Sequence, residues 1–275
     1  MTDHPNGLRT LLDNSGFELI PMKSTADKAL ALPSGTTVSV TASPAKGMSA
    51  TVDLTEQFVG MGLDVIPHMS ARLTKSRAEL RGILARLEEI GTRQAFVVGG
   101  DADDPGEYRD AMDLIRAMED IGHPFDAIGV TGYPEGHPFI PDELLMQALI
   151  EKQPHASSIT TQMCFDVGAI ERWVTEIRAN GIELPVKIGI PGVTDVTKLI
   201  GISMRIGVGT SLKFISKNRS LATQLLKPYS PANLVGDLAA LAEQPDLGIA
   251  GLHIYTFNQV EATLAWYHGE REALP

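Results

Sequence analysis

The chain has 275 residues, of which 43% are hydrophobic, so it is long enough to bury a sizeable core. Its formal net charge of −11 disfavours nucleic acid and anionic membrane surfaces as partners. The single cysteine, Cys164, excludes an intrachain disulfide and a cysteine-based metal centre, so no bound metal is predicted. The amino terminus lacks the apolar core of a signal sequence. Together these features predict a soluble, cytoplasmic protein.

Short apolar runs rich in β-formers alternate with longer stretches of helical period, a pattern typical of repeated βα units. The predicted strands are Phe17–Ile20, Thr37–Thr41, Leu63–Pro67, Ala95–Val98, Ala127–Thr131, Ser158–Gln162, Val186–Ile190 and Gly251–Tyr255. The predicted helices are Leu54–Gly62, a helix from the capping box Ser76-x-x-Glu79 to about Ile90, Glu107–Ile121, Asp142–Glu151, Val167–Asn180 and Val196–Arg205. The interval from Ser216 to Glu243 is long enough for two more helices, one of them beginning at Ser230-Pro231.

Eight strands separated by helices predict an α/β fold, a single (β/α)8 TIM barrel over residues 1–275 with a helical insertion near 216–243. An open doubly wound sheet is the alternative. A dinucleotide fingerprint of the Rossmann kind is absent, because Gly207-x-Gly209 lacks the third glycine and the strand before it.

Polar side chains stand at or near the carboxyl ends of seven of these strands, where a barrel of this kind carries its active site. They are Glu18, Thr41, His68, Asp101, the group Tyr133, Glu135 and His137, Gln162, and the segment Tyr255–Asn258. Since an unpaired buried charge is costly, a carboxylate inside an apolar strand suits a general acid.

Several of these residues also have a purely structural interpretation. Glu18 could pair with Lys23 or Lys46, and Asp101 could cap a helix. His68 could be a core histidine. Asn258 with Glu261 matches a capping box for the last helix.

Two further structural interpretations concern the loop Gly132–Pro138 and the lone cysteine. Two prolines and two glycines make this loop a stiff turn, in which Glu135 is expected to brace the chain. Cys164 lies between Met163 and Phe165 and is expected to be a packing residue.

The chain resembles the methylenetetrahydrofolate reductases, flavin-dependent (β/α)8 enzymes of one-carbon metabolism. The matching stretches run in order along the chain: Phe17-Glu18-Leu19-Ile20-Pro21, Val38-Ser39-Val40-Thr41, Pro67-His68-Met69-Ser70, Gly100-Asp101, Tyr133-Pro134-Glu135-Gly136-His137-Pro138, Thr161-Gln162 with Phe165-Asp166, and His253-Ile254-Tyr255-Thr256-Phe257-Asn258.

This resemblance implies the reduction of 5,10-methylenetetrahydrofolate to 5-methyltetrahydrofolate with NADH or NADPH. Glu18 matches the family's general acid, and Asp101 and Gln162 match residues that hold the pterin ring. The positions that line the flavin are matched by Thr41, His68, Tyr133 and His137.

The chain departs from the family pattern at the cofactor. Gly99 stands where the family has an arginine that helps to hold the flavin, which leaves FAD binding open and raises direct hydride transfer from the nicotinamide as a hypothesis. Gln259 replaces a basic residue thought to face the folate tail, and the match at Glu151 or Lys152 is ambiguous. A folate-dependent methyltransferase-type barrel and a non-catalytic folate-binding paralogue remain alternatives. Oligomeric state and the choice between NADH and NADPH are not predicted.

Overall fold

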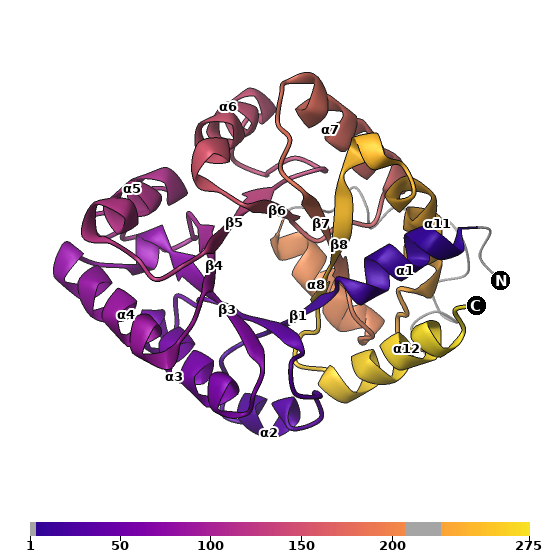
Figure 1. Ribbon diagram of the computed structural model, residues 1–275, viewed down its shortest axis with the longest axis horizontal. Coiled ribbons are helices and arrows are strands. Elements are labelled where there is room, and N and C mark those ends of the chain that lie inside the picture. The colour runs from indigo at the N-terminus through magenta and orange to yellow at the C-terminus, as the bar shows by residue number, and fades with distance from the viewer. Residues whose placement is uncertain (1–3, 207–226) are drawn as a thin grey trace. The chain divides into compact units, whose positions relative to one another are not determined.

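The computed structural model describes residues 4–206 and 227–275, and its eight strands form a closed, all-parallel barrel in chain order (Figure 1). The closed barrel confirms the predicted (β/α)8 fold and excludes the open sheet. The strands are β1 (Gly16–Leu19), β2 (Thr37–Val40), β3 (Asp64–Ser70), β4 (Gln94–Val98), β5 (Ala127–Gly132), β6 (Ser158–Thr161), β7 (Val186–Pro191) and β8 (Ile249–Tyr255). Among the described helices, none is long and apolar enough to cross a membrane.

The helices of the described chain follow the strands in the expected alternation. They are α1 (Pro5–Asp13), α2 (Thr25–Ala29), α3 (Gly47–Gly60), α4 (Arg77–Ile90), α5 (Ala111–Ile121), α6 (Asp142–Lys152), α7 (Val167–Ala179), α8 (Val196–Arg205), α11 (Ala232–Ala242) and α12 (Val260–Glu272), with short 3₁₀ turns η1 (Ala71–Leu73), η2 (Gln153–His155) and η3 (Pro245–Leu247). The chain divides into two compact units, which are described separately.

The first unit, called the β1–β5 unit, consists of Gly16–Thr131 and Glu151–Ser158. Its strands pair in parallel, with Glu18 beside Ser39 in the register of β1 and β2. Side chains alternate along a strand, so Phe17 and Leu19 point to the side of β1 opposite Glu18. Helices α3, α4 and α5 lie along the outer side of these strands (Figure 1). This arrangement buries both faces, which explains the near-continuous apolar runs in the sequence.

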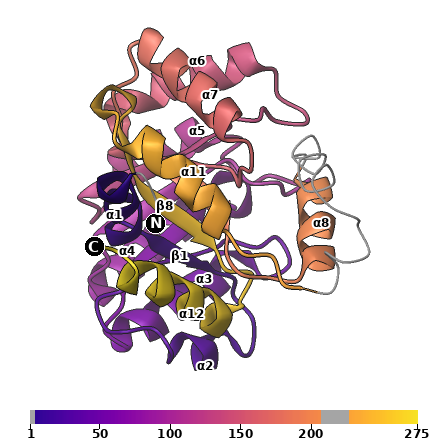
Figure 2. The ribbon, with the colours of Figure 1, turned by 90° about the vertical axis from the view of Figure 1, so that its right-hand side faces the viewer.

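The second unit, called the β6–β8 unit, contains Met1–Ser15, Gly132–Ile150 and Ile159–Pro275, apart from the undescribed residues. Helix α1, which the sequence did not reveal, packs against α11 and β8 (Figure 2). Leu8, Leu11 and Leu12 form its buried stripe. A Cβ on Gly7 would collide with the backbone of Ala239, so only glycine permits this close approach.

The predicted helix ends agree with the structure in most places. Gly62, Gly91, Gly122 and Gly181 all have positive φ, a backbone conformation that favours glycine, and Gly91 caps α4 in the left-handed conformation. Ser76 caps α4 by accepting a hydrogen bond from the backbone N–H of Glu79, at 3.2 Å. The reciprocal bond differs from the standard box, because the Glu79 carboxylate accepts from the backbone of Lys75 at 2.6 Å.

Several predicted boundaries are wrong. Strand β3 continues to Ser70, three residues past the predicted end at Pro67, so His68 lies within the strand and not after it. Helix α3 begins at Gly47, seven residues before the predicted start, and α5 begins after the cap residue Asp110 instead of at Glu107. The cap of α12 is Gln259 and not Asn258, because Asn258 adopts a left-handed conformation with φ of 59°. The predicted insertion near 216–243 falls partly outside the described residues. Its described part contains α11, which follows Pro231 as expected, and the single-domain assignment remains a prediction.

Candidate functional site

Glu18 and His68 meet inside the β1–β5 unit. Glu18, on β1, is 8% exposed, and His68, on β3, is 7% exposed. The Nε2 atom of His68 lies 3.7 Å from a carboxylate oxygen of Glu18, which is ion-pair range but too long for a hydrogen bond. The imidazole also contacts the ring of Phe96, with centroids 4.8 Å apart. A buried carboxylate therefore lies beside a buried imidazole.

Thr41 and Asp101, two other predicted residues of this unit, lie just beyond strand ends. Thr41 follows β2 and is half-buried, and its backbone N–H still donates to Leu19 of β1 at 3.0 Å. Asp101 is exposed in the loop after β4. It does not cap α5, because that cap is Asp110, so the structural interpretation of Asp101 as a helix cap is wrong.

The loop after β4 is held by two cationic side chains. Arg72 donates from Nε to the carbonyl of Ala102 at 2.6 Å and from Nη2 to the carbonyl of Asp103 at 3.2 Å. Lys75 donates from Nζ to the carbonyl of Asp104 at 2.6 Å. These cations therefore serve the loop's own backbone.

Gly99 opens this loop, at the position where the sequence lacks the family's arginine. A Cβ added at Gly99 would meet no heavy atom within 4 Å, and its φ is not positive. Neither space nor backbone conformation therefore requires glycine here. The neighbouring Gly100 differs, because its φ is +86° and a Cβ would collide with the hydroxyl of Ser70.

In the β6–β8 unit, the loop after β5 fixes the half-buried rings of Tyr133 and His137, which meet edge to face with centroids 5.2 Å apart. Burial lowers the pKa of His137, which favours the neutral imidazole. Its Nδ1 accepts the backbone N–H of Phe139 at 3.3 Å, which leaves the ring proton on Nε2. His137 is thus held as a hydrogen-bond donor through Nε2.

Glu135 ties this loop to the one after β6, as the brace interpretation predicted. One carboxylate oxygen accepts the backbone N–H groups of Phe165 at 2.9 Å and Asp166 at 3.3 Å. Burial raises the pKa of Glu135, and those two hydrogen bonds oppose the shift.

Gln162 and Cys164 follow β6. The backbone N–H of Gln162 donates to Gly132 at 2.7 Å, and its half-buried side chain accepts the N–H of Met163 at 3.3 Å. Cys164 is fully buried, its Sγ lies 2.9 Å from the carbonyl of Gln162, and burial raises the pKa of its thiol. Its interpretation as a packing residue is confirmed.

Sequence reasoning missed a strained turn after β8. Phe257 and Asn258 have φ of 49° and 59°, a region that non-glycine residues rarely adopt. Lys198 of α8 donates to the carbonyl of Phe257 at 3.0 Å, and its ammonium lies 5.9 Å from the Phe257 ring centroid. Strain of this kind concentrates at functional sites. The sequence carried no signal for it, because no glycine marks the turn.

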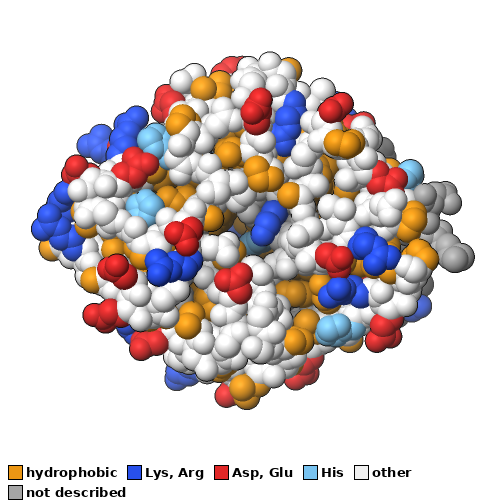
Figure 3. Space-filling view, viewed as in Figure 1, with side chains coloured by type: hydrophobic (Ala, Val, Ile, Leu, Met, Phe, Trp, Pro, Cys, Tyr) orange, Lys and Arg blue, Asp and Glu red, His pale blue; other side chains and the backbone are white. Residues whose placement is uncertain are grey.

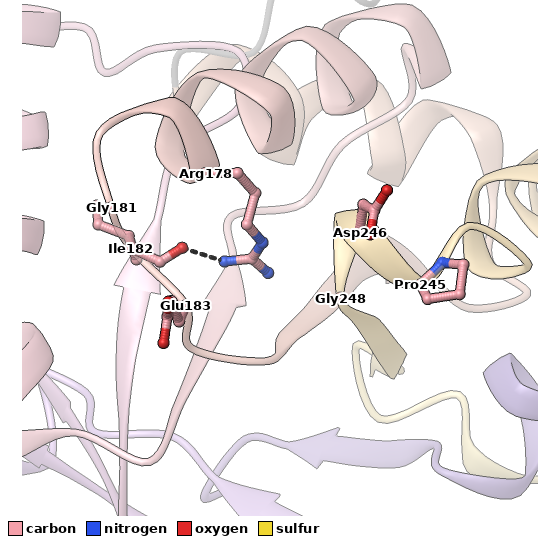
Figure 4. A pocket seen from close by; sticks show the side chains of 7 residues that line it. All are labelled: Arg178, Gly181, Ile182, Glu183, Pro245, Asp246 and Gly248. Carbon is pink, nitrogen blue, oxygen red and sulfur yellow. Dashed lines mark hydrogen bonds between the residues drawn. The ribbon is translucent and has the colours of Figure 1, made fainter.

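A cavity of about 330 Å³ beside Arg178 has a structural explanation (Figure 4). The guanidinium donates to the carbonyls of Ile182 at 2.6 Å, Leu184 at 2.9 Å and Leu247 at 2.8 Å. Because its N–H groups are engaged by backbone, Arg178 fastens two turns and is not available to an anionic ligand.

Comparison with known proteins places this arrangement in a family. The family model for methylenetetrahydrofolate reductase matches residues 22–269. Methylenetetrahydrofolate reductase 2 of Saccharomyces cerevisiae is 31% identical over 58% of this chain, and methylenetetrahydrofolate reductase 1 of Schizosaccharomyces pombe is 32% identical over 39%. The matched parts are only 27% and 19% of those relatives' lengths.

Among solved structures, an uncharacterized protein from Clostridium thermocellum that binds two copies of 5-methyl-5,6,7,8-tetrahydrofolic acid shares the fold. Its TM-score is 0.61 at 12% identity, over 94% of this chain and 95% of that one. The family model covers nearly the whole chain, including every predicted site residue except Glu18, which lies just before the matched range. The chain therefore belongs to the methylenetetrahydrofolate reductase family.

Proposed function

We propose that this protein reduces 5,10-methylenetetrahydrofolate to 5-methyltetrahydrofolate, with NADH or NADPH as the hydride donor. Family membership supports a folate-related reductase, and the fold that it shares with a 5-methyltetrahydrofolate-binding protein is compatible with a folate substrate. The observation that carries the proposal is the buried carboxylate of Glu18 on β1, with the Nε2 of His68 3.7 Å away.

Glu18 acts as the general acid. It donates a proton to N10 of the folate, the bond between N10 and the methylene carbon breaks, and the resulting iminium accepts a hydride at that carbon. A buried acid suits this step because water must be kept from the iminium. Asp101 and Gln162 are proposed to hold the pterin ring, since each offers a hydrogen-bonding side chain just beyond a strand end.

The residues at the flavin-lining positions fit a flavin only in part. Thr41, His68, Tyr133 and His137 offer hydrogen-bonding groups and ring surfaces, and His137 offers a fixed Nε2–H donor. The cation expected for a cofactor diphosphate is missing at Gly99, and Arg72 is engaged by the loop's carbonyls. We therefore propose that no flavin takes part and that the nicotinamide supplies the hydride directly.

The general-acid role predicts that Glu18→Gln lowers kcat by about 10²- to 10⁴-fold, because the amide cannot donate that proton. NADH oxidation with methylenetetrahydrofolate, followed together with methyltetrahydrofolate formation, measures it. Glu135→Gln is the matched control, since its amide oxygen can keep both backbone bonds. Unchanged turnover in Glu18→Gln would rule out this mechanism. Consumption of 5-methyltetrahydrofolate without NADH oxidation would indicate methyl transfer instead.

The flavin-free proposal predicts that the purified protein releases no flavin on denaturation and turns over without added FAD. Gly99→Arg should strengthen FAD binding measured by fluorescence quenching, because the added guanidinium supplies a diphosphate partner where a side chain has room. Gly99→Leu, similar in bulk but uncharged, is the control. One flavin released per wild-type chain would overturn the proposal.

A further inference from the structure

A second cavity, of about 310 Å³, lies within the β6–β8 unit, between the loop after β6 and the start of α11. One wall is Phe165–Gly168, and the other is formed by Tyr229, Ser230 and the first turns of α11. Helix α8 stands apart from α11 and α12 in the view of Figure 2. The volume suits one heteroaromatic ring system with its sugar, and is too small for a whole dinucleotide or folate.

The inner wall of this cavity is aromatic and apolar. The rings of Phe165 and Tyr229 meet edge to face, with centroids 6.2 Å apart at 80°. Leu234 of α11 closes the apolar surface and is 8% exposed. Such a wall offers ring faces and edges against which a flat ligand packs well.

The polar lining consists of hydrogen-bonding groups that are neutral or acidic. Asn233 and Asp237 are exposed and lie one turn apart on α11, and Asp166 lies at the opposite wall. None of the described lining residues is a lysine, arginine or histidine. A phosphate or carboxylate inside would be repelled, whereas an amino group would find acceptors.

A cation stands only at the edge of the described lining. The Nη1 atom of Arg172 is 3.2 Å from the position that a Cβ on Gly168 would occupy. The cavity thus combines an uncharged or acidic interior with a guanidinium beside its rim. This arrangement suits a ligand that places a ring with an amino group inside the cavity and leaves its phosphates outside, near the guanidinium.

Hydrogen bonds connect one wall of this cavity to the loop after β5, but the residues proposed to act on the substrates do not line it. Phe165 and Asp166 donate their backbone N–H groups to Glu135, in the loop that carries Tyr133 and His137. None of the residues proposed to act on the pterin or the nicotinamide lines the cavity. A ring bound there would therefore not be the reacting ring.

We infer that this cavity takes the adenine ring of the nicotinamide dinucleotide, an inference that rests on the proposed function. Adenine is uncharged, flat and carries an exocyclic amino group, which Asp237 or Asn233 would accept. The other non-reacting end available, the benzoyl-glutamate tail of the folate, carries carboxylates that Asp166 and Asp237 disfavour. A 2′-phosphate on the dinucleotide would meet the same two carboxylates, so NADH is preferred over NADPH.

The test compares two reductants that share the reacting ring. Reduced nicotinamide mononucleotide lacks adenosine, so changes in this cavity should affect NADH alone. Asp237→Asn combined with Asn233→Ala should raise the KM for NADH about five- to tenfold and leave kcat unchanged. The kcat/KM for the mononucleotide should stay constant. Asp246→Asn, an exposed carboxylate beside the Arg178 cavity, should alter neither.

Equal effects on both reductants, or no effect on NADH, would overturn the inference. Adenosine should also inhibit competitively against NADH, with a weaker inhibition constant in the double variant. If the protein oxidises neither reductant, the proposed function fails, and calorimetry with adenosine still decides the matter. Binding to the wild type that weakens in the double variant supports the adenine pocket, and absence of binding refutes it.

Discussion

At the scale of single residues, Glu135 shows how a loop carboxylate serves structure while standing beside proposed functional residues. One of its oxygens accepts the N–H groups of Phe165 and Asp166, which begin the wall of the inferred adenine pocket. The brace therefore sets the spacing between the loops after β5 and β6. Its burial disfavours the ionised form, as the raised pKa indicates.

This raised pKa makes a prediction about stability and pH. The folded protein holds the Glu135 proton more tightly than the unfolded chain, so ionisation costs stability as pH rises above the unfolded pKa. Glu135→Gln cannot ionise, and its melting temperature relative to wild type should increase between pH 4.5 and 8. Thermal unfolding in a series of buffers measures this difference.

Two measurements distinguish the effect of the Glu135 hydrogen bonds on stability from the effect of its ionisation. Glu135→Ala removes both hydrogen bonds and should lower the free energy of unfolding by roughly 1–3 kcal/mol at low pH. This deficit relative to wild type should shrink as the pH rises, because alanine, like glutamine, cannot ionise. A difference between Glu135→Gln and wild type that stays flat over this range would contradict the burial effect.

At the scale of elements, Arg178 fastens the turn after α7 to η3. Three carbonyl groups, from Ile182, Leu184 and Leu247, accept hydrogen bonds from its guanidinium. Gly248 follows directly with φ of +61°, and a Cβ there would lie 2.6 Å from Nη2 of Arg178. The Arg178 side chain, called the Arg178 clamp below, therefore occupies space that is free only because residue 248 is glycine. Burial lowers the pKa of the guanidinium.

Removing this clamp should destabilise the fold without altering the chemistry. Arg178→Ala leaves three carbonyls without their donor and should lower the free energy of unfolding by roughly 2–4 kcal/mol. Arg178→Lys should recover only part, because a single ammonium cannot reproduce the planar fork. Urea unfolding measures both, with the exposed Arg116→Ala as control. A loss of kcat in folded Arg178→Ala would assign this residue a role beyond the clamp.

At the scale of the whole molecule, net charge governs how anionic substrates approach. The chain carries 34 acidic and 23 basic side chains, and both kinds are interspersed over the face shown in Figure 3. The formal charge of −11 sets the sign of the long-range field. Both proposed substrates are anions.

The kcat/KM for NADH and for methylenetetrahydrofolate should therefore rise when ionic strength increases. The Debye length shortens from about 30 Å at 0.01 M salt to about 8 Å at 0.15 M, which screens the repulsion. Steady-state rates across a potassium chloride series measure this, with sucrose as an uncharged control for viscosity. A fall in kcat/KM with salt would instead reveal a local cationic field that attracts the substrates.

The sequence by itself determined the strand order and most strand ends, because apolar runs buried on both faces and glycines at helix ends leave direct signals. It also made Glu18 a candidate general acid, because a charge in an apolar strand is conspicuous. Other features needed the tertiary structure. The apolar face of the nine-residue helix α1 is too short to be recognised from sequence periodicity. The turn at Phe257 and Asn258 contains no glycine that would predict its positive φ angles.

Contacts between residues far apart in the sequence could also be found only in the tertiary structure. The pairing of Glu18 with His68, the brace from Glu135 to Phe165 and the wall joining Phe165 to Tyr229 link residues 30 or more positions apart. Sequence periodicity reports which face of an element is buried, but not which side chains meet across elements. Only the folded chain brings Asp166 and Asp237 together in the cavity that we infer to bind adenine.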